Sequence, residues 1–352
     1  MIKTDVIILG SGIAGLVLSV LLKRKKINHI VLDRIQKQKS LALAETLPPS
    51  ALVLLEELEL LEDFKETALK KTYGYHAIWG SSVLKTVDFF NNNPFKYGLK
   101  LDKEATLKRL KNKVDEHLIP YKQIVSMAHS EKEIKVTVQQ KAEQETVSGK
   151  WIIDATGRNR ALLQALKITE KTYDDLMAFS CHVQLTEHPQ LIHQVYTEAF
   201  EHGWGIVSSL SEKEQAMTLF TSKAIGIHQK ISLFSSWKNV LSDTKYLKTF
   251  LSKNSFTKVL GKKANTTAAS QFAGNNWLAI GDAAFTFDPL SSHGISNAIY
   301  TAKKAADVLT DDTYKPKTYN ADLKAIFNSY LASKKNMYAS ETRWANSEFW
   351  KE

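Results

Sequence analysis

The stretch DVIILGSGIAGLVLSVLLKRKKINHIVLDR, residues 5–34, contains the pattern that decides the fold. Its residues 6–9 form a short apolar run, which is typical of a buried parallel strand. Glycines in the spacing G-x-G-x-x-G follow, then a helical pattern over residues 13–26 and a second apolar run over residues 29–32. A strand, a glycine-rich turn, a helix and a second strand in this order predict a dinucleotide-binding unit.

Each glycine of this turn has a physical role. Gly10 allows the tight turn out of the strand, Gly12 lets the backbone approach a pyrophosphate, and Gly15 lets the helix pack closely on the strand. The free N–H groups at the start of the helix are suited to bind the phosphates. The predicted phosphate-binding turn therefore also includes Ser11, Ile13 and Ala14.

An acidic residue stands where the ribose of the dinucleotide is expected. Asp33 follows Gly12 by 21 residues, close to the spacing of an acid that accepts hydrogen bonds from ribose hydroxyls, and Arg34 lies beside it. This segment alone does not separate NAD from FAD. A glycine-rich turn without any ligand is the simpler alternative.

The second informative stretch is GDAAFTFDPLSSHG, residues 281–294, between a short apolar strand and a helix over residues 295–309. Asp282 at the end of the strand can accept a hydrogen bond from a ribityl hydroxyl. Gly294 at the start of the helix can present free N–H groups to an electron-rich ring edge. A flavin has both the polyol chain and such a ring edge, so FAD is predicted rather than NAD. The same flavin site is expected to include Gly281, Pro289, Ser292 and Ile295.

Between these stretches, residues 151–153 read as a buried strand that returns to the nucleotide-binding sheet. The small residues Ala155 and Gly157 follow, and they would let the backbone pass close to a bound dinucleotide. Residues 134–138 alternate in polarity as a half-exposed antiparallel strand does. Leucines at 52, 55, 58 and 61 recur as on one face of a helix.

The predicted fold is α/β: a Rossmann-like FAD-binding domain of the glutathione-reductase type, an inserted strand-rich substrate domain and a C-terminal helical segment. The FAD-binding domain is assigned to residues 1–75, 100–170 and 274–310, the substrate domain to 76–99 and 171–273, and the C-terminal segment to 311–352.

Composition restricts the class of protein. The 352 residues are 43% apolar and 24% charged, as expected for a globular protein with a hydrophobic core. A single cysteine, Cys181, rules out a disulfide within the chain and favours a cytoplasmic protein with a buried, inert thiol. The net charge of +10 comes from scattered lysines, so no nucleic-acid partner is predicted, and no metal-ligand spacing occurs. Residues 6–22 are too short and too glycine-rich for a transmembrane segment.

Taken together, residues 10–15 with Asp33 and Arg34, residues 154–157 and residues 281–294 resemble FAD-dependent monooxygenases of the para-hydroxybenzoate-hydroxylase type. FDPLSSHG and AETLPP are similar to the branch that contains the tryptophan halogenases. The ending YASETRWANSEFWKE resembles that of flavoproteins that mature cysteine-tryptophylquinone amino-acid oxidases, such as lysine or glycine oxidases.

The resemblance implies hydroxylation of an electron-rich aromatic through a flavin C4a-hydroperoxide. The expected substrate is an indole, a tryptophan side chain of an oxidase precursor that is the partner protein. It also implies O2 as co-substrate, and either NAD(P)H or reduced flavin from another protein as reductant. Near the flavin we expect Glu45 and His293, with Trp79 and Trp204 lining the pocket. Both tryptophans could equally be core residues.

The sequence also departs from these relatives. Halogenases carry W-x-W-x-I-P, where GWGIVSS has Trp204 alone, and an essential lysine on the strand corresponding to YHAIWGSS, which has none. Lys103 stands where the family has an arginine near the flavin. The alternatives are a small-molecule aromatic hydroxylase or halogenase, a double-bond reductase, and a flavin-bound chaperone without catalysis. FDPLSSHG differs from the reductase pattern N-P-L-T-G-E-G.

Overall fold

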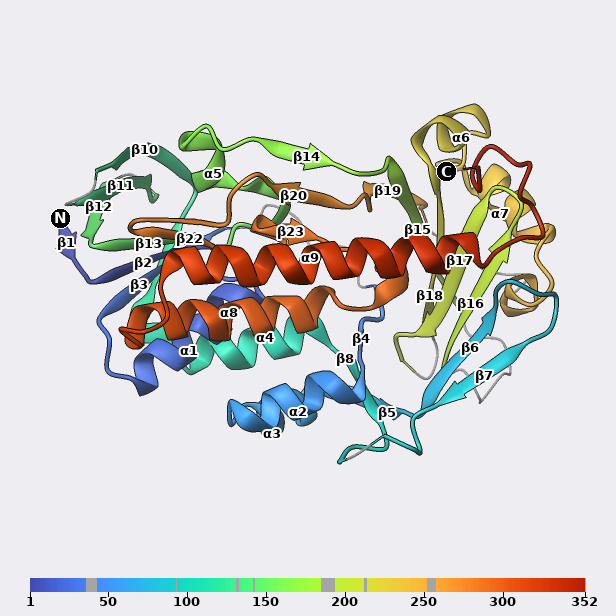
Figure 1. Cartoon of the computed structure of the whole chain (residues 1–352), viewed down its shortest axis with the longest axis horizontal. Helices are drawn as coiled ribbons and strands as arrows, with labels where there is room; N and C mark the ends of the chain where they lie inside the picture. Colours follow the sequence, from blue (N-terminus) through green and yellow to red (C-terminus); the bar gives the residue numbers. More distant parts are fainter. Residues whose placement is uncertain are drawn as a thin grey trace.

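The structure is a computed structural model that describes residues 1–35, 43–92, 94–130, 133–141, 143–184, 194–211, 214–251 and 258–351. Two large sheets lie at opposite ends of the molecule, and the long helix α9 (Pro316–Ala339) runs from one toward the other (Figure 1). This arrangement confirms the predicted α/β fold with a Rossmann-like unit, a strand-rich insertion and a C-terminal helix.

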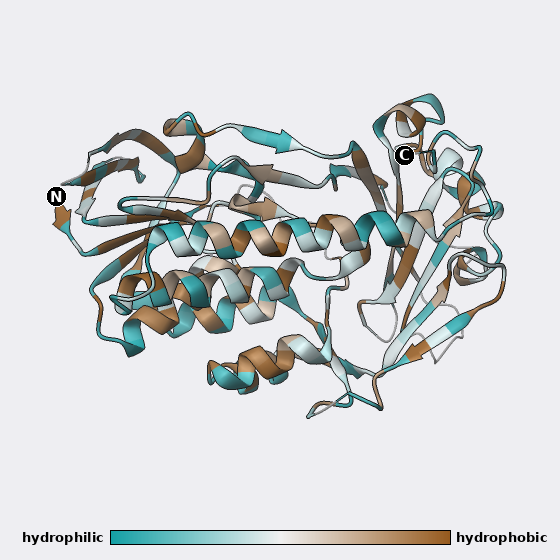
Figure 2. Cartoon of the chain, in the orientation of Figure 1, coloured by the Kyte–Doolittle hydropathy of each residue, from teal (hydrophilic) through white to brown (hydrophobic). Residues whose placement is uncertain are grey.

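The six-stranded sheet contains the predicted nucleotide-binding unit. Its strands β2, β3, β9, β13 and β22 are parallel, and only β21 is antiparallel at one edge. All four residues of β2 are buried, which explains why the run is continuously apolar (Figure 2). The order across the sheet is β21 (Ala273–Gly274), β22 (Trp277–Ala279), β13 (Trp151–Asp154), β2 (Val6–Leu9), β3 (His29–Arg34) and β9 (Leu118–Tyr121).

Three smaller sheets surround this one. The alternating burial of β11 agrees with the predicted antiparallel strand. The four-stranded sheet contains β1 (Ile2–Lys3), β12 (Gln144–Gly149), β11 (Ile134–Gln139) and β10 (Gln123–His129). The three-stranded sheets contain β14 (Glu170–Thr172), β20 (Thr267–Ala269) and β23 (Phe285–Thr286), and β4 (Thr46–Leu47), β8 (Gly98–Leu101) and β5 (Ala68–Thr72).

The helices of this half pack mainly against the six-stranded sheet and against one another. They are α1 (Ile13–Arg24), α2 (Pro49–Glu57), α3 (Leu61–Lys65), α4 (Lys103–Asn112), α5 (Ala161–Ala165) and α8 (Gly294–Thr310). The leucine pattern predicted one helical face from Leu52 to Leu61, and this prediction is wrong in one respect. Glu59 has a left-handed φ of 53°, so the chain turns there and forms two helices. All four leucines are nevertheless buried.

The seven-stranded sheet has two different faces. One packs against α6 (Lys223–His228) and α7 (Phe234–Ser242) around a core that includes Trp237 and Cys181, so the predicted buried thiol is confirmed. The other face includes Trp204 and packs against Leu290. The sheet order is β19 (Leu260–Lys263), β15 (Leu176–Gln184), β18 (Glu214–Ser222), β17 (Gly203–Ser209), β16 (Gln194–Phe200), β6 (Gly74–Ile78) and β7 (Lys85–Asp88).

The burial of His29 makes the fold sensitive to acid. Its ring is fully buried, with Nε2 2.8 Å from the Ser19 hydroxyl and Nδ1 2.8 Å from the Ile27 carbonyl oxygen. Burial lowers the pKa of His29 to about 4. The unfolded chain therefore binds a proton that the folded chain does not, in the window between the two pKa values. Stability from this group is complete above the unfolded pKa and is lost as the pH falls toward 4.

We expect His29 to contribute about 3 kcal/mol to the decrease in the free energy of unfolding as the pH falls from about 6.5 to about 4. Denaturant titrations over this range should show a shallower pH slope for His29→Gln than for the wild type. The exposed His228→Gln is the control and should keep the wild-type slope. Equal slopes in all three proteins would contradict the assignment.

Candidate active site

The N-terminal glycine turn is closed by protein on one side and open on the other. A Cβ on Gly10, whose φ is +108°, would lie 2.6 Å from the Ala155 carbonyl oxygen, and one on Gly15 would lie 2.0 Å from that of Gly10. A Cβ on Gly12 would meet no atom within 4 Å. Gly10 and Gly15 are therefore required by the packing of the fold. The space in front of Gly12 is available to a ligand at the N-terminus of α1, where N–H groups favour phosphate.

The C-terminal glycine segment lies beside this turn. α1 and α8 pack together, and a Cβ on Gly281 (φ +56°) would lie 3.1 Å from the Ala14 side chain. Two further glycines, Gly157 and Gly294, also have no atom within 4 Å of the position a Cβ would take. Segments from the two ends of the sequence thus lie together, and each has a glycine with open space beside it, as binding of one dinucleotide requires.

The polar groups beside this space are suited to hydroxyl and phosphate groups. Burial raises the pKa of Asp282, and the positive charges of Arg158 and Lys103 oppose this rise. Lys103 Nζ lies 2.7 Å from Glu45 Oε1. Burial lowers the pKa of Lys103, but the Glu45 and Asp282 carboxylates outweigh this effect and raise it above its usual value. Glu45 Oε2 is buried and has no hydrogen-bond partner among the described residues, so it can accept a bond from a ligand.

Asp33 and Arg34 lie at the end of β3, next to the glycine turn. The Asp33 carboxylate accepts hydrogen bonds from the Ser11 hydroxyl and from Lys111 Nζ. Arg34 is exposed. The predicted contact of Asp33 with a ribose hydroxyl would join or replace these bonds, and it remains a prediction.

The loop before α8 is fixed by its own side chains. Asp288 is 2% exposed and accepts a 2.8 Å hydrogen bond from the Leu290 N–H, where Pro289 begins a single 3₁₀ turn. Ser292 follows with a left-handed φ of 53°, and Gly294 and Ile295 open the helix. His293 is the N-cap residue, and its ring meets Phe287 edge-on at 6.3 Å. These contacts fix the position of the α8 N-terminus.

Sequence reasoning missed Tyr75 on β6. Burial raises the pKa of Tyr75 to about 12, and a side-chain hydrogen bond with Ser292 opposes this shift. The phenol of Tyr75 on β6 therefore lies near the loop that is predicted to hold the flavin ring. Alternation within GYHAI predicts two faces for the strand, but it does not tell which face meets a loop more than 200 residues away.

Lys100 was also missed. It is 1% exposed and donates to the Gln194 carbonyl oxygen at 2.8 Å and to the Ser209 hydroxyl at 3.1 Å. Burial lowers its pKa to about 7. Lys100 therefore links β8, which lies beside Glu45, to the ends of β16 and β17.

Trp79 and Trp204 belong to an aromatic cluster with the C-terminal segment. Trp204 is fully buried, stacks on Phe220 at 3.9 Å and donates from Nε1 to the Tyr338 hydroxyl at 3.0 Å. Trp79 donates to the Met337 carbonyl oxygen at 2.8 Å and meets Trp204 edge-on. Core packing accounts for Trp204, and a role of either ring in lining a substrate pocket remains a prediction.

The described part of the chain contains neither a membrane-spanning helix nor a metal-ligand cluster. No helix there is long and apolar enough to cross a membrane. No group of three or more histidine, cysteine or acidic side chains is arranged there to hold a metal ion.

A sheet that carries the G-x-G-x-x-G turn, open space beside each of Gly12, Gly157 and Gly294, and a half-buried Asp282 define an FAD-dependent oxidoreductase. Residues 3–325 match the model of the FAD binding domain family, and the chain belongs to that family.

Three known proteins are similar over nearly the whole chain. LodB of Marinomonas mediterranea, which carries the name of an FAD-dependent oxidoreductase, is 26% identical over 355 residues, covering 98% of this chain and 95% of LodB. The myxobacterial chondrochloren halogenase CndH superposes with a TM-score of 0.87 at 16% identity, covering 100% of this chain and 86% of CndH. QhpG, a peptidyl tryptophan dihydroxylase essential for tryptophylquinone cofactor biogenesis, superposes with a TM-score of 0.77 at 16% identity, covering 99% and 78%. The two solved structures show a shared fold.

Proposed function

We propose that this protein is a monooxygenase that hydroxylates a tryptophan side chain of a partner amino-acid oxidase during maturation of its tryptophylquinone cofactor. The observation that carries the proposal is that β6, with the sequence GYHAI, contains no lysine and places Tyr75 near the flavin loop. The name of QhpG, a peptidyl tryptophan dihydroxylase, supports the same function, and the name of LodB supports the broader class of FAD-dependent oxidoreductases.

Different residues of this chain would bind different parts of FAD. Gly12 and Asp33 would hold the diphosphate and ribose, Asp282 the ribityl chain, and the N–H groups at the start of α8 the ring edge. When bound and reduced, FAD supplies the activation of O2 and the transfer of oxygen. The N–H groups at the α8 N-terminus would stabilise negative charge on that ring. The reductant is NAD(P)H or reduced flavin from another protein.

The seven-stranded sheet would form the other wall of the reaction site. The face of this sheet toward the loop before α8 carries Tyr75. Trp204 and Phe220 pack together at the other end of the same face. A neutral phenol can donate a hydrogen bond without supplying a charge. Burial keeps Tyr75 protonated well above neutral pH, and a packed wall excludes water from the reacting indole.

The proposal is tested by mass analysis of an oxidase precursor that is expressed without this protein and then incubated with it, reduced FAD, O2 and chloride. The expected product carries one or two added oxygen atoms on tryptophan, and the Asp282→Ala variant should give far less of it. Replacement of a hydrogen by chlorine would instead indicate a halogenase. Maturation that proceeds equally with a flavin-free variant would indicate a chaperone, and an unmodified precursor would refute the proposal.

A further inference from the structure

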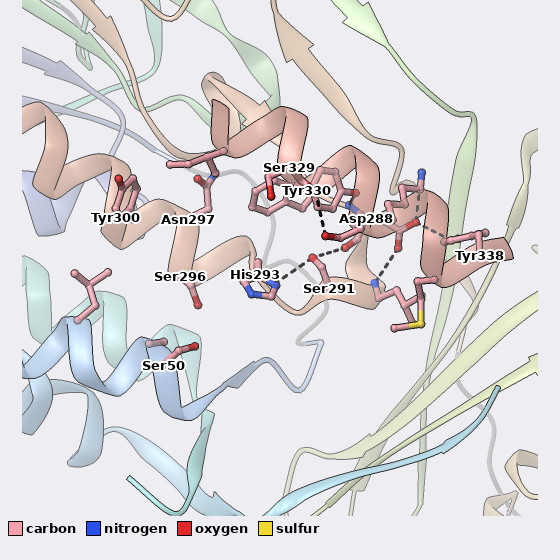
Figure 3. Close-up of a pocket in the computed structure, with 18 residues that line it drawn as sticks. Ser50, Asp288, Ser291, His293, Ser296, Asn297, Tyr300, Ser329, Tyr330 and Tyr338 are labelled. Carbon is pink, nitrogen blue, oxygen red and sulfur yellow. Dashed lines mark hydrogen bonds and ion pairs between the residues drawn. The ribbon is translucent and has the colours of Figure 1, made fainter. Parts of the chain in front are cut away.

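A cavity of about 610 Å³ opens between α2, α8 and α9, beside the flavin loop. Figure 3 shows Ser50 of α2 on one side, Ser329 and Tyr330 of α9 on the other, and Asn297 and Tyr300 of α8 between them. None of the residues predicted to hold the diphosphate or ribityl chain lines it. The cavity adjoins the predicted flavin site at the loop before α8, where Asp288, Leu290, Ser291 and His293 line it. We call it the three-helix groove.

The groove is long enough for a chain segment. Along α9 its wall extends from Ile326 to Tyr338. At about 1.5 Å of rise per helical residue, this wall is roughly 18 Å long. An extended chain rises about 3.3 Å per residue, so the groove accommodates roughly five residues. A free amino acid would occupy only part of this length.

The floor of the groove has unsatisfied hydrogen-bonding groups. Asn297 is 6% exposed, and its Nδ2 has no hydrogen-bond partner in the part of the chain that the structure describes. The Ser296 hydroxyl, one position earlier on α8, is likewise buried and unpartnered there. Buried amide donors are nearly always paired, and backbone carbonyl oxygens are their commonest acceptors. Both groups have almost no accessible surface, so a guest polypeptide would supply such acceptors once the side chains that cover them shift.

The charges beside the groove disfavour a charged guest. Lys334 lines it, but its Nζ is paired with Asp174 and lies 3.6 Å from Asp288 Oδ2. The other walls are mainly aromatic and aliphatic, and include Tyr300, Tyr330 and Met337. An uncharged segment with apolar side chains is therefore the best match.

We propose that the three-helix groove binds an extended, uncharged segment of the partner protein that flanks the target tryptophan. This inference rests on the proposed function. Continuity with the reaction site supports it. One end of the groove reaches Tyr338, whose hydroxyl bonds both Asp288 and Trp204, and its wall includes His293 at the start of α8.

The test uses the FAD-loaded protein and a library of uncharged, end-blocked dodecapeptides, each with one central tryptophan. Ser329→Trp fills the groove from α9, whereas Asn328→Trp places the same side chain on an exposed residue outside it. We expect wild type and Asn328→Trp to retain a common set of peptides, and Ser329→Trp to retain them at least tenfold less. A library with glutamates flanking the tryptophan should be retained weakly.

Several outcomes would overturn the inference. These are equal retention by both variants, no retention by any protein, preference for the acidic library, or competition by N-acetyltryptophanamide as strong as that by peptides. A wild-type dimer that Ser329→Trp converts to a monomer would assign the groove to a second copy of this chain. The retained peptides are then incubated with reduced FAD and O2. Retention without added oxygen would refute the proposed hydroxylation and leave the groove assignment intact.

Discussion

Replacement of Gly12 by valine is expected to abolish tight FAD binding and to leave the folded protein intact. Gly12 has φ −73° and ψ −179°, which valine adopts without strain, and a Cβ there would meet no protein atom within 4 Å. The added methyl groups would occupy the space in front of the α1 N-terminus where the pyrophosphate is expected. We expect the affinity for FAD to fall at least about 100-fold, equivalent to about 2.7 kcal/mol.

Flavin content after purification and titration of the apoprotein with FAD measure this effect, and the thermal midpoint of the apoprotein measures the fold. The matched control is Gly15→Ala, whose Cβ would lie 2.0 Å from the Gly10 carbonyl oxygen. That variant should unfold at a lower temperature even without FAD. A Gly12→Val protein that is still yellow, or one that fails to fold, would show that the open space is not the phosphate site.

Replacement of Lys334 by methionine is expected to cost about 3–5 kcal/mol of the free energy of unfolding at neutral pH. Lys334 Nζ pairs with Asp174 and donates to the Thr266 hydroxyl at 3.2 Å, and it lies 3.6 Å from Asp288 Oδ2. Asp174 and Asp288 are 11% and 2% exposed at their side chains. Without the ammonium, two buried carboxylates would share no cation, so the loss exceeds that of a surface ion pair.

The pH dependence identifies the cause. Burial raises the pKa of Asp288, and the charge of Lys334 opposes this rise, so the variant should raise the pKa further. When the pKa of a carboxyl group is higher in the folded than in the unfolded state, its protonation stabilises the fold, and this stabilisation is lost as the pH rises through the folded-state pKa. The loss in the free energy of unfolding of Lys334→Met should therefore be larger at about pH 8 than at about pH 5. Urea denaturation at both values measures it. The exposed neighbour Lys335→Met should stay within about 0.5 kcal/mol of wild type. A pH-independent loss would indicate lost packing instead.

The parts of the fold that could be predicted are those that depend on local chemistry. The glycine turn, the buried β2 run and the helix after Gly294 each need only a few neighbouring residues to define them. The break at Glu59 escaped prediction, because leucine spacing continues through it and no glycine or proline marks the turn. The local pattern fixes which residues are buried, but it does not fix the direction of the chain between them.

The candidate site could be predicted only where one segment carries its own ligand chemistry. Gly12, Asp282 and Gly294 each have a recognisable neighbourhood in the sequence. Tyr75 and Lys100 do not, because their positions depend on how the seven-stranded sheet meets the loop before α8. The same holds for the three-helix groove, whose walls come from α2, α8 and α9. The Asn297 side-chain amide, which has no partner among the described residues, could not be singled out in a helical stretch that contains several small polar residues.

The parallel order of β2, β13 and β22 has a consequence for biosynthesis. A ribosome that adds about 5–20 residues per second makes β22 roughly a quarter of a minute to a minute after β2. Until then β13 pairs with β2 on one side and has no neighbour on the other. Gly294 emerges later still, so a flavin site that needs both Gly12 and Gly294 forms only after residue 294 has been made.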